Sequence, residues 1–348
     1  MNLVVNIEKR LRDFTLRANF TLTDTTLALL GASGSGKSMT LKCIAGLETP
    51  DRGQIILNGR TLYDSSAGVN LPPQERSVGY LFQNYALFPN MTVRENIIFA
   101  LDGSREEKKR ILAENVARFS LEGLEDARPS ALSGGQQQRV AFARILARGA
   151  DVLLLDEPLS ALDTHLKWQI ETALREILMG QNIAAILVTH DRDEAFRIAQ
   201  EIATVDRGQL TPPMDRHELF RSPGTCAGAR LTGCKNISAA RRRDAAHIEA
   251  TDWGITLAVT DDMTDAHHIA IRAHYFVPVQ EDGENVFPAQ IVEMIESTFS
   301  MIVMLRFADG AHLVRWEVDK PAWEALHVSE NASLRICFPP DALMLLRD

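Results

Sequence analysis

The chain has few cysteines, and none of them is arranged as in a metal site. The four cysteines, Cys43, Cys226, Cys234 and Cys337, form no C-x-x-C pair. The sequence therefore indicates neither a zinc site nor a disulfide framework. A reducing cytosol is the simplest compartment for such a chain.

Long hydrophobic runs are also missing. No apolar stretch of the sequence approaches the roughly 20 residues that a helix needs to cross a bilayer. Residues 1–7 lack the layout of a signal peptide and alternate between apolar and polar side chains, as a strand does. If the protein works at a membrane, we expect another chain to hold it there.

Positive charge is not in excess. The chain carries 37 Lys and Arg against 46 Asp and Glu, which gives a formal net charge of −9. Broad, non-specific binding to nucleic acid depends on a basic surface, so we predict no nucleic-acid partner. The arginines at 241–243 are followed by Asp244 and are interpreted as solvated surface.

One glycine-rich stretch fits the phosphate-binding pattern G-x-x-x-x-G-K-[ST] without a mismatch. It consists of Gly31, Ala32, Ser33, Gly34, Ser35, Gly36, Lys37 and Ser38. The apolar run at 26–30 predicts a strand before it, and residues 39–45 predict a helix after it. In that context backbone N–H groups and the helix N-terminus bind a phosphate chain. Lys37 reaches the β- and γ-phosphates, and Ser38 holds Mg²⁺. The alternative is a chance glycine-rich turn.

Further polar residues follow other predicted strands. Asp156 ends an apolar strand, where its carboxylate can hold Mg²⁺, and Glu157 can accept a proton from an attacking water. Gln83 offers its amide to the metal or the water, and His190 can contact the γ-phosphate. Each residue by itself has an alternative interpretation. Gln83 would then be an ordinary polar residue at the end of a strand, and His190 the residue at the start of a helix.

A second phosphate-binding surface is predicted at another helix start. It offers a serine hydroxyl and glycine amides in the run Leu132, Ser133, Gly134, Gly135 and Gln136. The stretch 160–163, which ends in Asp163, lies close behind the two acids.

The 348 residues suggest two domains, with three small ones as the alternative. Up to about residue 222, strand-like runs alternate with helical patterns, which predicts an α/β fold with a parallel sheet covered by helices. After about Pro223, strand-like segments separated by glycine and aspartate turns predict a small β-barrel. We place the domains at 1–230 and 231–348, with a helical subdomain at about 84–150.

Together these patterns resemble the ATP-binding cassette ATPases over residues 1 to about 222. The family names are Walker A for 31–38, Q-loop for Gln83, signature for 132–136, Walker B for 152–156, catalytic glutamate for Glu157, D-loop for 160–163 and switch histidine for His190. The resemblance implies a P-loop NTPase cassette with an antiparallel β subdomain and a helical subdomain, followed by a small OB-like barrel.

The resemblance also implies ATP as substrate and Mg²⁺ as cofactor, with Ser38, Gln83 and Asp156 holding the metal. It implies a head-to-tail homodimer, in which the signature of one subunit covers ATP bound to the Walker A of the other. The residues reaching across are Ser133, Gly134, Gly135, Gln136 and Asp163. Phe14 is the candidate for stacking on adenine; Leu11 at that place, and core packing of Phe14, are the alternatives.

Among cassette classes, a separate importer subunit fits best. The chain has no long insertion before the signature, only one visible cassette and no membrane helix. Apolar Tyr85, Leu87 and Phe88 follow Gln83 and predict a groove for a permease helix, with packing inside the helical subdomain as the alternative.

The C-terminal part of the sequence narrows the choice of the transported solute. The run at 271–274, I-R-A-H, and the stretches 231–237 and 285–289 are similar to molybdate-importer ATPases. We therefore expect a peripheral ATPase at the cytoplasmic face of the membrane. It would power uptake of molybdate or tungstate through separate permease subunits, with a periplasmic or extracellular solute-binding protein acting indirectly. The alternatives are sulfate, iron(III) or another small solute, and a soluble cassette switch without transport.

The predicted barrel has two interpretations. It stabilises the dimer, or it senses an oxyanion through Lys235, Asn236 and Ser238. Its histidines show no metal-ligand spacing with acids or cysteines.

Overall fold

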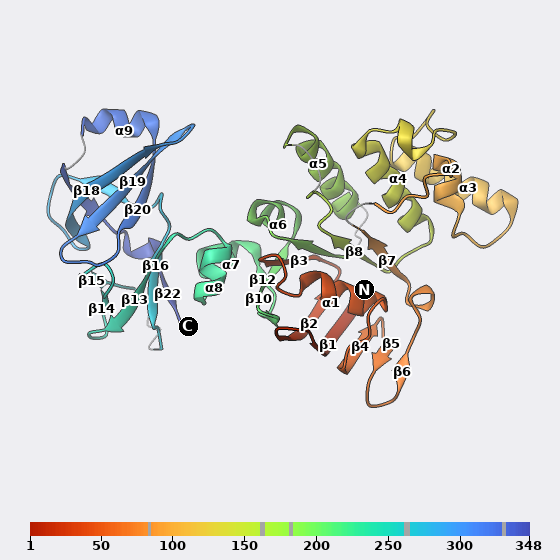
Figure 1. Ribbon diagram of the computed structural model, residues 1–348, viewed down its shortest axis with the longest axis horizontal. Coiled ribbons are helices and arrows are strands. Elements are labelled where there is room, and N and C mark those ends of the chain that lie inside the picture. Colours follow the sequence, from red (N-terminus) through yellow and green to blue (C-terminus); the bar gives the residue numbers. More distant parts are fainter. Residues whose placement is uncertain (83–84, 161–163, 181–183, 261–264, 329–331) are drawn as a thin grey trace. The chain divides into compact units, whose positions relative to one another are not determined.

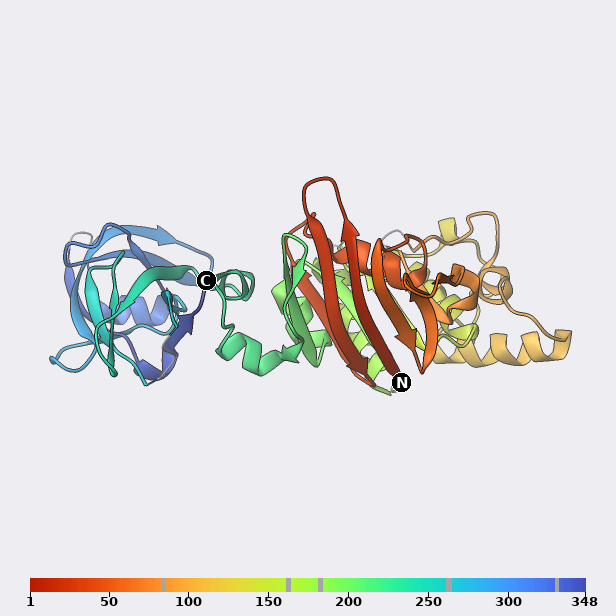
Figure 2. The ribbon, with the colours of Figure 1, turned by 90° about the horizontal axis from the view of Figure 1, so that it is seen from below.

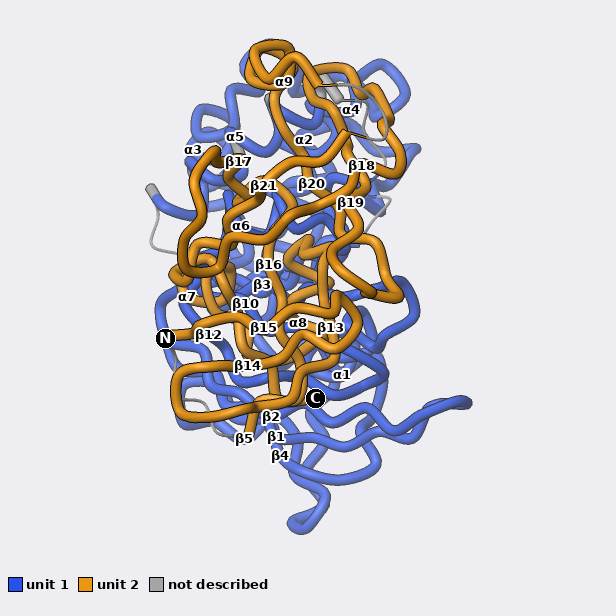
Figure 3. Tube along the Cα trace, turned by 90° about the vertical axis from the view of Figure 1, so that its left-hand side faces the viewer, with its two compact units in different colours: residues 1–216 blue, residues 217–348 orange. Residues whose placement is uncertain are grey.

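The computed structural model describes residues 1–82, 85–160, 164–180, 184–260, 265–328 and 332–348. These residues form two compact units, Met1–Arg216 and His217–Asp348, each of which is described by itself (Figure 3).

The division falls earlier than the expected boundary between residues 230 and 231. Helix α8 (Cys226–Leu231) explains the difference, because its apolar side chains are buried within the second unit. Cys226 and Ala229 share a small core with Ala270, Met344 and Leu346. The helix therefore packs on the strands that follow it in sequence.

A twelve-stranded mixed sheet is the centre of the first unit (Figure 1). Its strands are β1 (Asn2–Arg10), β2 (Thr15–Thr23), β3 (Thr26–Gly31), β4 (Arg52–Leu57), β5 (Arg60–Asp64), β6 (Val69–Asn70), β7 (Val78–Leu81), β8 (Val152–Asp156), β9 (Ala185–Thr189), β10 (Glu201–Asp206), β11 (Gln209–Leu210) and β12 (Met214–Asp215). The order is β6-β5-β4-β1-β2-β11-β10-β3-β9-β8-β7, with β12 beside β10.

Two kinds of strand meet in this sheet. β10, β3, β9, β8 and β7 pair in parallel; β3 and β9 are buried along their whole length, as expected where both faces of a sheet are covered. β1 pairs antiparallel with β2 and β4, and β2 alternates between buried and exposed residues (Figure 2). The predicted parallel core with an antiparallel β subdomain is confirmed.

The helices of the first unit fall into two groups. α1 (Lys37–Ala45) and α6 (Arg192–Ile198) contact the parallel strands, and α5 (Thr164–Gly180) contacts α6. α2 (Val93–Ile98), α3 (Arg105–Arg118) and α4 (Gly134–Ala147) pack against one another. This second group lies within the residues where a helical subdomain is expected.

The second unit is built from two five-stranded antiparallel sheets around one core. One has the order β15-β14-β13-β16-β22 and the other β17-β21-β18-β19-β20. The bounds are α7 (Arg216–Arg221), β13 (Asn236–Arg242), β14 (His247–Ala250), β15 (Ile255–Ala258), β16 (His268–Ile271), β17 (Val277–Val279), β18 (Val286–Glu296), β19 (Ser300–Phe307), β20 (Val314–Asp319), α9 (Lys320–Leu326), β21 (Ser333–Cys337) and β22 (Leu343–Leu346). Trp253, Trp316 and Phe338 are fully buried in that core.

A buried arginine fixes the far end of α1. Arg76 is 1% exposed, and its Nη1 donates to the carbonyl oxygens of Cys43 and Ile44 at 2.9 Å each. Its Nε donates to the Leu71 carbonyl and its Nη2 to Asn70 Oδ1, both at 2.8 Å. The last carbonyls of a helix have no partner within the helix, so this guanidinium satisfies them and ties α1 to the loop before β7.

Replacing Arg76 by methionine should remove these hydrogen bonds. The Cys43 carbonyl keeps the Gly46 N–H as a donor at 3.2 Å, whereas the buried Ile44 carbonyl loses the donor described here. We expect Arg76→Met to lower the free energy of unfolding of the first unit by about 1–3 kcal/mol, measured by urea titration with circular dichroism. Arg94→Met is the control, because Arg94 makes an exposed pair with Asp126 at 3.3 Å that contributes at most about 1 kcal/mol. Equal stability of the two variants would contradict the proposed role of Arg76.

Candidate nucleotide site

The glycine-rich loop joins β3 to α1, as its pattern predicts. An added Cβ at Gly31 would lie 2.3 Å from the Val205 carbonyl oxygen, and Gly36 has φ +108°. Neither position accepts a larger residue without strain. The buried Ser35 hydroxyl has no hydrogen-bond partner among the described residues, which leaves a polar atom in the loop for a ligand.

Lys37 is held inside this loop. Its Nζ donates to the carbonyl oxygens of Gly31 and Ala32, both at 2.8 Å, and the residue is 4% exposed. Burial lowers the pKa of Lys37, against the opposing effect of the carboxylates of Glu157 and Asp156. A positive charge is therefore concentrated where the pattern expects phosphates.

The donor set beside the loop fits magnesium. Ser38 Oγ donates to Asp156 Oδ1 at 2.7 Å, so the hydroxyl and the carboxylate meet although 118 residues separate them. Hard oxygen ligands of this kind suit Mg²⁺, which is usually bound by one or two protein groups together with substrate phosphates. Consistently, no group of three or more His, Cys, Asp or Glu that could hold a metal occurs among the described residues.

Glu157 and His190 lie next to each other. They follow the neighbouring parallel strands β8 and β9, and His190 Nδ1 is 3.5 Å from Glu157 Oε2. Glu157 has φ +45°, and its N–H donates to the Val188 carbonyl at 3.1 Å. Such left-handed backbone in a non-glycine residue costs of order 1–3 kcal/mol and is concentrated at functional sites. Here it accompanies the turn that brings Glu157 beside His190.

An ion-pair cluster next to His190 was not predicted from the sequence. Lys167 Nζ on α5 lies 2.6 Å from both Asp191 Oδ2 and Glu194 Oε1, while Asp191 also accepts from the first N–H groups of α6. Burial acts to raise the pKa of Asp191, but the hydrogen bonds from Lys167 and backbone N–H groups outweigh it and hold that pKa below its usual value. The N-cap role was readable from an Asp before a helix; the lysine partner was not.

The signature residues form the start of α4. Ser133 Oγ accepts from the Gln136 N–H at 3.3 Å, and Gln136 Oε1 accepts from the Ser133 N–H at 2.8 Å, which is a capping box. Gly134 and Gly135 open the helix. Figure 1 shows α4 among α2 and α3, apart from α1. The signature and the phosphate loop are therefore separate surfaces of one subunit.

Three other predicted positions have different outcomes. Phe14 lies beside the loop, since an added Cβ at Gly36 would meet its Cε2 at 3.5 Å and one at Gly208 its Cδ2 at 2.4 Å. Its adenine contact stays a prediction, with packing on Gly208 as the alternative. Gln83 and Asp163 lie outside the described residues, so their roles also stay predictions.

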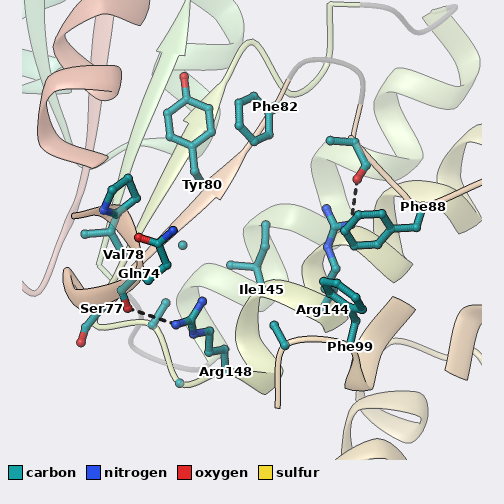
Figure 4. Close-up of a pocket in the computed structure, with 16 residues that line it drawn as sticks. Gln74, Ser77, Val78, Tyr80, Phe82, Phe88, Phe99, Arg144, Ile145 and Arg148 are labelled. Carbon is teal, nitrogen blue, oxygen red and sulfur yellow. Dashed lines mark hydrogen bonds between the residues drawn. The ribbon is translucent and has the colours of Figure 1, made fainter. Parts of the chain in front are cut away.

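An apolar groove of about 550 Å³ lies next to β7 (Figure 4). Phe82, Phe88 and the 56% exposed Phe99 line it, and the Phe88 and Phe99 ring centroids are 4.6 Å apart. Arg144 covers the Phe88 ring at 5.4 Å and donates to the Ala86 carbonyl at 2.7 Å. Phe88 was predicted for this surface, whereas the predicted Tyr85 is buried and the groove uses Phe82 and Phe99.

Two of the residues predicted to hold an oxyanion in the second unit are already engaged. Asn236 exchanges two hydrogen bonds of 2.7 Å with the Arg315 backbone. The Ser238 hydroxyl donates to the Ala239 carbonyl at 2.8 Å and accepts from the Asp252 N–H at 3.0 Å. Both side chains are buried, and Lys235 is exposed. The polar atoms of Asn236 and Ser238 therefore already have partners inside the unit, and binding of an oxyanion by this unit stays a prediction.

Arg272 of the I-R-A-H run is likewise structural. Its Nη1 donates to the Thr232 carbonyl at 2.7 Å, its Nη2 donates to the Phe220 carbonyl, and its guanidinium lies over the Phe220 ring at 5.6 Å. It thereby joins β16 to the segment that carries α7 and α8.

Comparison with known proteins identifies the family of this chain. A family model described as ABC transporter matches residues 17–160. The spermidine/putrescine import ATP-binding protein PotA of Rubrobacter xylanophilus is 35% identical over 344 residues, which cover 94% of this chain and 89% of that protein. This chain belongs to the ABC transporter family.

Two further relatives are also named as import ATP-binding proteins. The sulfate/thiosulfate import ATP-binding protein CysA of Thermosynechococcus vestitus is 36% identical over 89% of this chain and 87% of its own length. The Fe(3+) ions import ATP-binding protein FbpC 2 of Pectobacterium atrosepticum is 45% identical, but that alignment spans only 57% of each chain.

Two solved structures are similar to about three fifths of this chain. The cassette MJ0796, in a dimeric post-hydrolysis state with ADP and phosphate, is similar with TM-score 0.50 and 28% identity over 62% of this chain and 99% of its own. CbiO1 of Clostridium perfringens, part of the ABC transporter complex cbiONQ, has TM-score 0.55 and 25% identity over 63% and 90%. The predicted cassette fold, the ATPase activity and the use of ATP with Mg²⁺ are thereby confirmed.

Replacing Glu157 by glutamine tests its predicted role. We expect Glu157→Gln to retain ATP binding and to lose turnover by about 10²-fold or more, because the amide cannot take a proton from water. Phosphate release and equilibrium ATP binding would be measured side by side. The control is Glu114→Gln, which removes only an exposed i,i+4 pair with Arg110. Turnover close to that of the control would exclude Glu157 as the base.

Proposed function

We propose that this protein is the ATP-hydrolysing subunit of an importer, and that it acts at the cytoplasmic face of the membrane with separate permease subunits. The observation that carries the proposal is the Ser38–Asp156 pair on the phosphate loop, with Glu157 and His190 beside it. The import function is supported by the full-length relatives, PotA and CysA, both named as import ATP-binding proteins. None of the helices in the described part of the chain is long and apolar enough to cross a membrane.

The proposed roles of the residues are supported by their placement. The loop amides and Lys37 would bind the phosphate chain, and Ser38 and Asp156 would hold Mg²⁺, which would offset charge on the phosphate oxygens. Glu157 takes a proton from the attacking water as its oxygen bonds to the γ-phosphorus and the bond to the leaving ADP oxygen breaks. His190 orients the γ-phosphate. Gln83 is proposed to assist the metal or the water.

A second copy of the chain completes the site. Neither the phosphate loop nor the start of α4 encloses a γ-phosphate by itself. The N-terminus of α4 offers amides and a positive dipole end to an anion. We therefore propose a head-to-tail homodimer, in which Ser133, Gly134, Gly135 and Gln136 cover the partner's ATP and Asp163 lies at the interface. Closure would also exclude water.

A bulky residue at Ser133 should block closure without disturbing the loop. We expect Ser133→Arg to bind ATP normally but to lose hydrolysis by about 10²-fold or more and to remain monomeric in gel filtration with ATP. Ser104→Arg is the matched control, because Ser104 is an equivalent N-cap on α3. Normal hydrolysis by Ser133→Arg would contradict the head-to-tail arrangement.

The groove beside β7 is proposed as the permease contact. An apolar groove rimmed by aromatic rings suits one face of an amphipathic helix. The exposed ring of Phe99 and the neighbouring ring of Phe88 would fill the space between the side chains of that helix.

For the cargo we propose an oxyanion, with molybdate or tungstate first. The support is the resemblance of residues 231–237 and 285–289 to molybdate-importer ATPases. The relatives named above are importers of sulfate/thiosulfate, iron(III) and spermidine/putrescine, so these cargoes are the alternatives. Because Asn236 and Ser238 are engaged internally, we propose that the second unit stabilises the dimer.

Reconstitution with its permease and solute-binding protein tests the cargo. We expect molybdate and tungstate to stimulate ATP hydrolysis in proteoliposomes, and sulfate, iron(III) and spermidine to leave it at the basal rate. Stimulation by sulfate alone would show that sulfate, and not molybdate or tungstate, is the transported solute. If no permease binds this protein or stimulates its ATP hydrolysis, the result would instead favour a cassette switch without transport.

A further inference from the structure

Both carboxylate oxygens of Asp156 accept a hydrogen bond from a hydroxyl group. Ser38 Oγ donates to Oδ1 at 2.7 Å, and the Tyr80 hydroxyl donates to Oδ2 at 2.8 Å. Ser38 belongs to the metal donors described above. Tyr80 has no role in the hydrolysis so far derived, yet it contacts the carboxylate that holds the metal.

The position of Tyr80 is set by the sheet. β7 and β8 pair in parallel with Tyr80 opposite Leu154, so its side chain lies close to the end of β8. The Tyr80 ring lies 4.5 Å from the Phe82 ring, measured between centroids (Figure 4). Because the strand and the neighbouring ring hold the phenol, its hydroxyl has one direction in which to donate.

The direction of the hydrogen bond between Tyr80 and Asp156 follows from its two groups. The phenol O–H donates, and the carboxylate oxygen Oδ2 accepts at 2.8 Å. Donation to Oδ2 holds the plane of the carboxyl group, and Oδ1 is directed toward Ser38.

We propose that Tyr80 is a positioning residue, which fixes the orientation of Asp156 and thereby strengthens binding of Mg²⁺ together with nucleotide. The proposal rests on the magnesium-nucleotide site and is independent of import and cargo. Partners of this kind, which hydrogen-bond to a metal ligand, typically contribute 10–100-fold to metal affinity or activity. If the hydrogen bond of the Tyr80 hydroxyl only gave a buried polar group a partner, it would contribute nothing to the affinity for the metal.

The test compares Tyr80→Phe with Tyr63→Phe in the full chain. Tyr63 is the matched control, because its hydroxyl is also buried and donates at 2.6 Å to the Pro50 carbonyl. Mn²⁺ is the metal probe, and its affinity is measured by electron paramagnetic resonance in the presence of ADP. ADP affinity is measured separately in EDTA. We expect Tyr80→Phe to weaken Mn²⁺ binding by about 10–100-fold and to leave ADP binding in EDTA unchanged.

A double-mutant cycle separates positioning from a general effect. In the Asp156→Asn background, Tyr80→Phe should produce no further loss of Mn²⁺ affinity, since it acts only through that carboxylate. Unchanged or tighter Mn²⁺ binding by Tyr80→Phe would overturn the proposal; tighter binding would show that the hydroxyl competes with the metal. Loss of ADP binding in EDTA, or full additivity with Asp156→Asn, would also overturn it.

Discussion

The edge formed by the carboxyl ends of parallel strands is the constraint on which the nucleotide site depends. β3, β9, β8 and β7 run in the same direction side by side, so the residues that end them meet at one edge. Gly31, Asp156 and His190 are far apart in sequence but share this edge. The strands are buried among apolar side chains, so the short distances at the site depend on rigid strand pairing.

Helix ends are the second fixed element. The N-terminus of α1 faces the phosphate loop, and its C-terminus is held by the guanidinium of Arg76. On the other side, Lys167 joins α5 to the start of α6 directly after His190. Charged side chains therefore hold the C-terminal end of α1 and the N-terminal end of α6 in place. The signature helix α4 belongs to a different group of helices, with α2 and α3.

Strand β7 contributes to both the nucleotide site and the groove. Tyr80 both donates to Asp156 and lines the groove, and Phe82 beside it lines the same surface. A partner bound in this groove would therefore lie against Tyr80, the side chain that donates to Asp156.

Much of the site could be read from the sequence, because its motifs are local. The loop at 31–38, the acids at 156 and 157 and the box at Ser133 each require only neighbouring residues and one strand or helix boundary. The sequence could not show that Tyr80 donates to Asp156, that Lys167 pairs with Asp191, or that the amide of Asn236 is engaged by a strand. These contacts depend on register and packing between distant segments, and a side chain's partner there is decided by which groups burial leaves to satisfy. Residue types and spacing thus determined the chemistry, whereas the tertiary structure decided which side chains hold it in place.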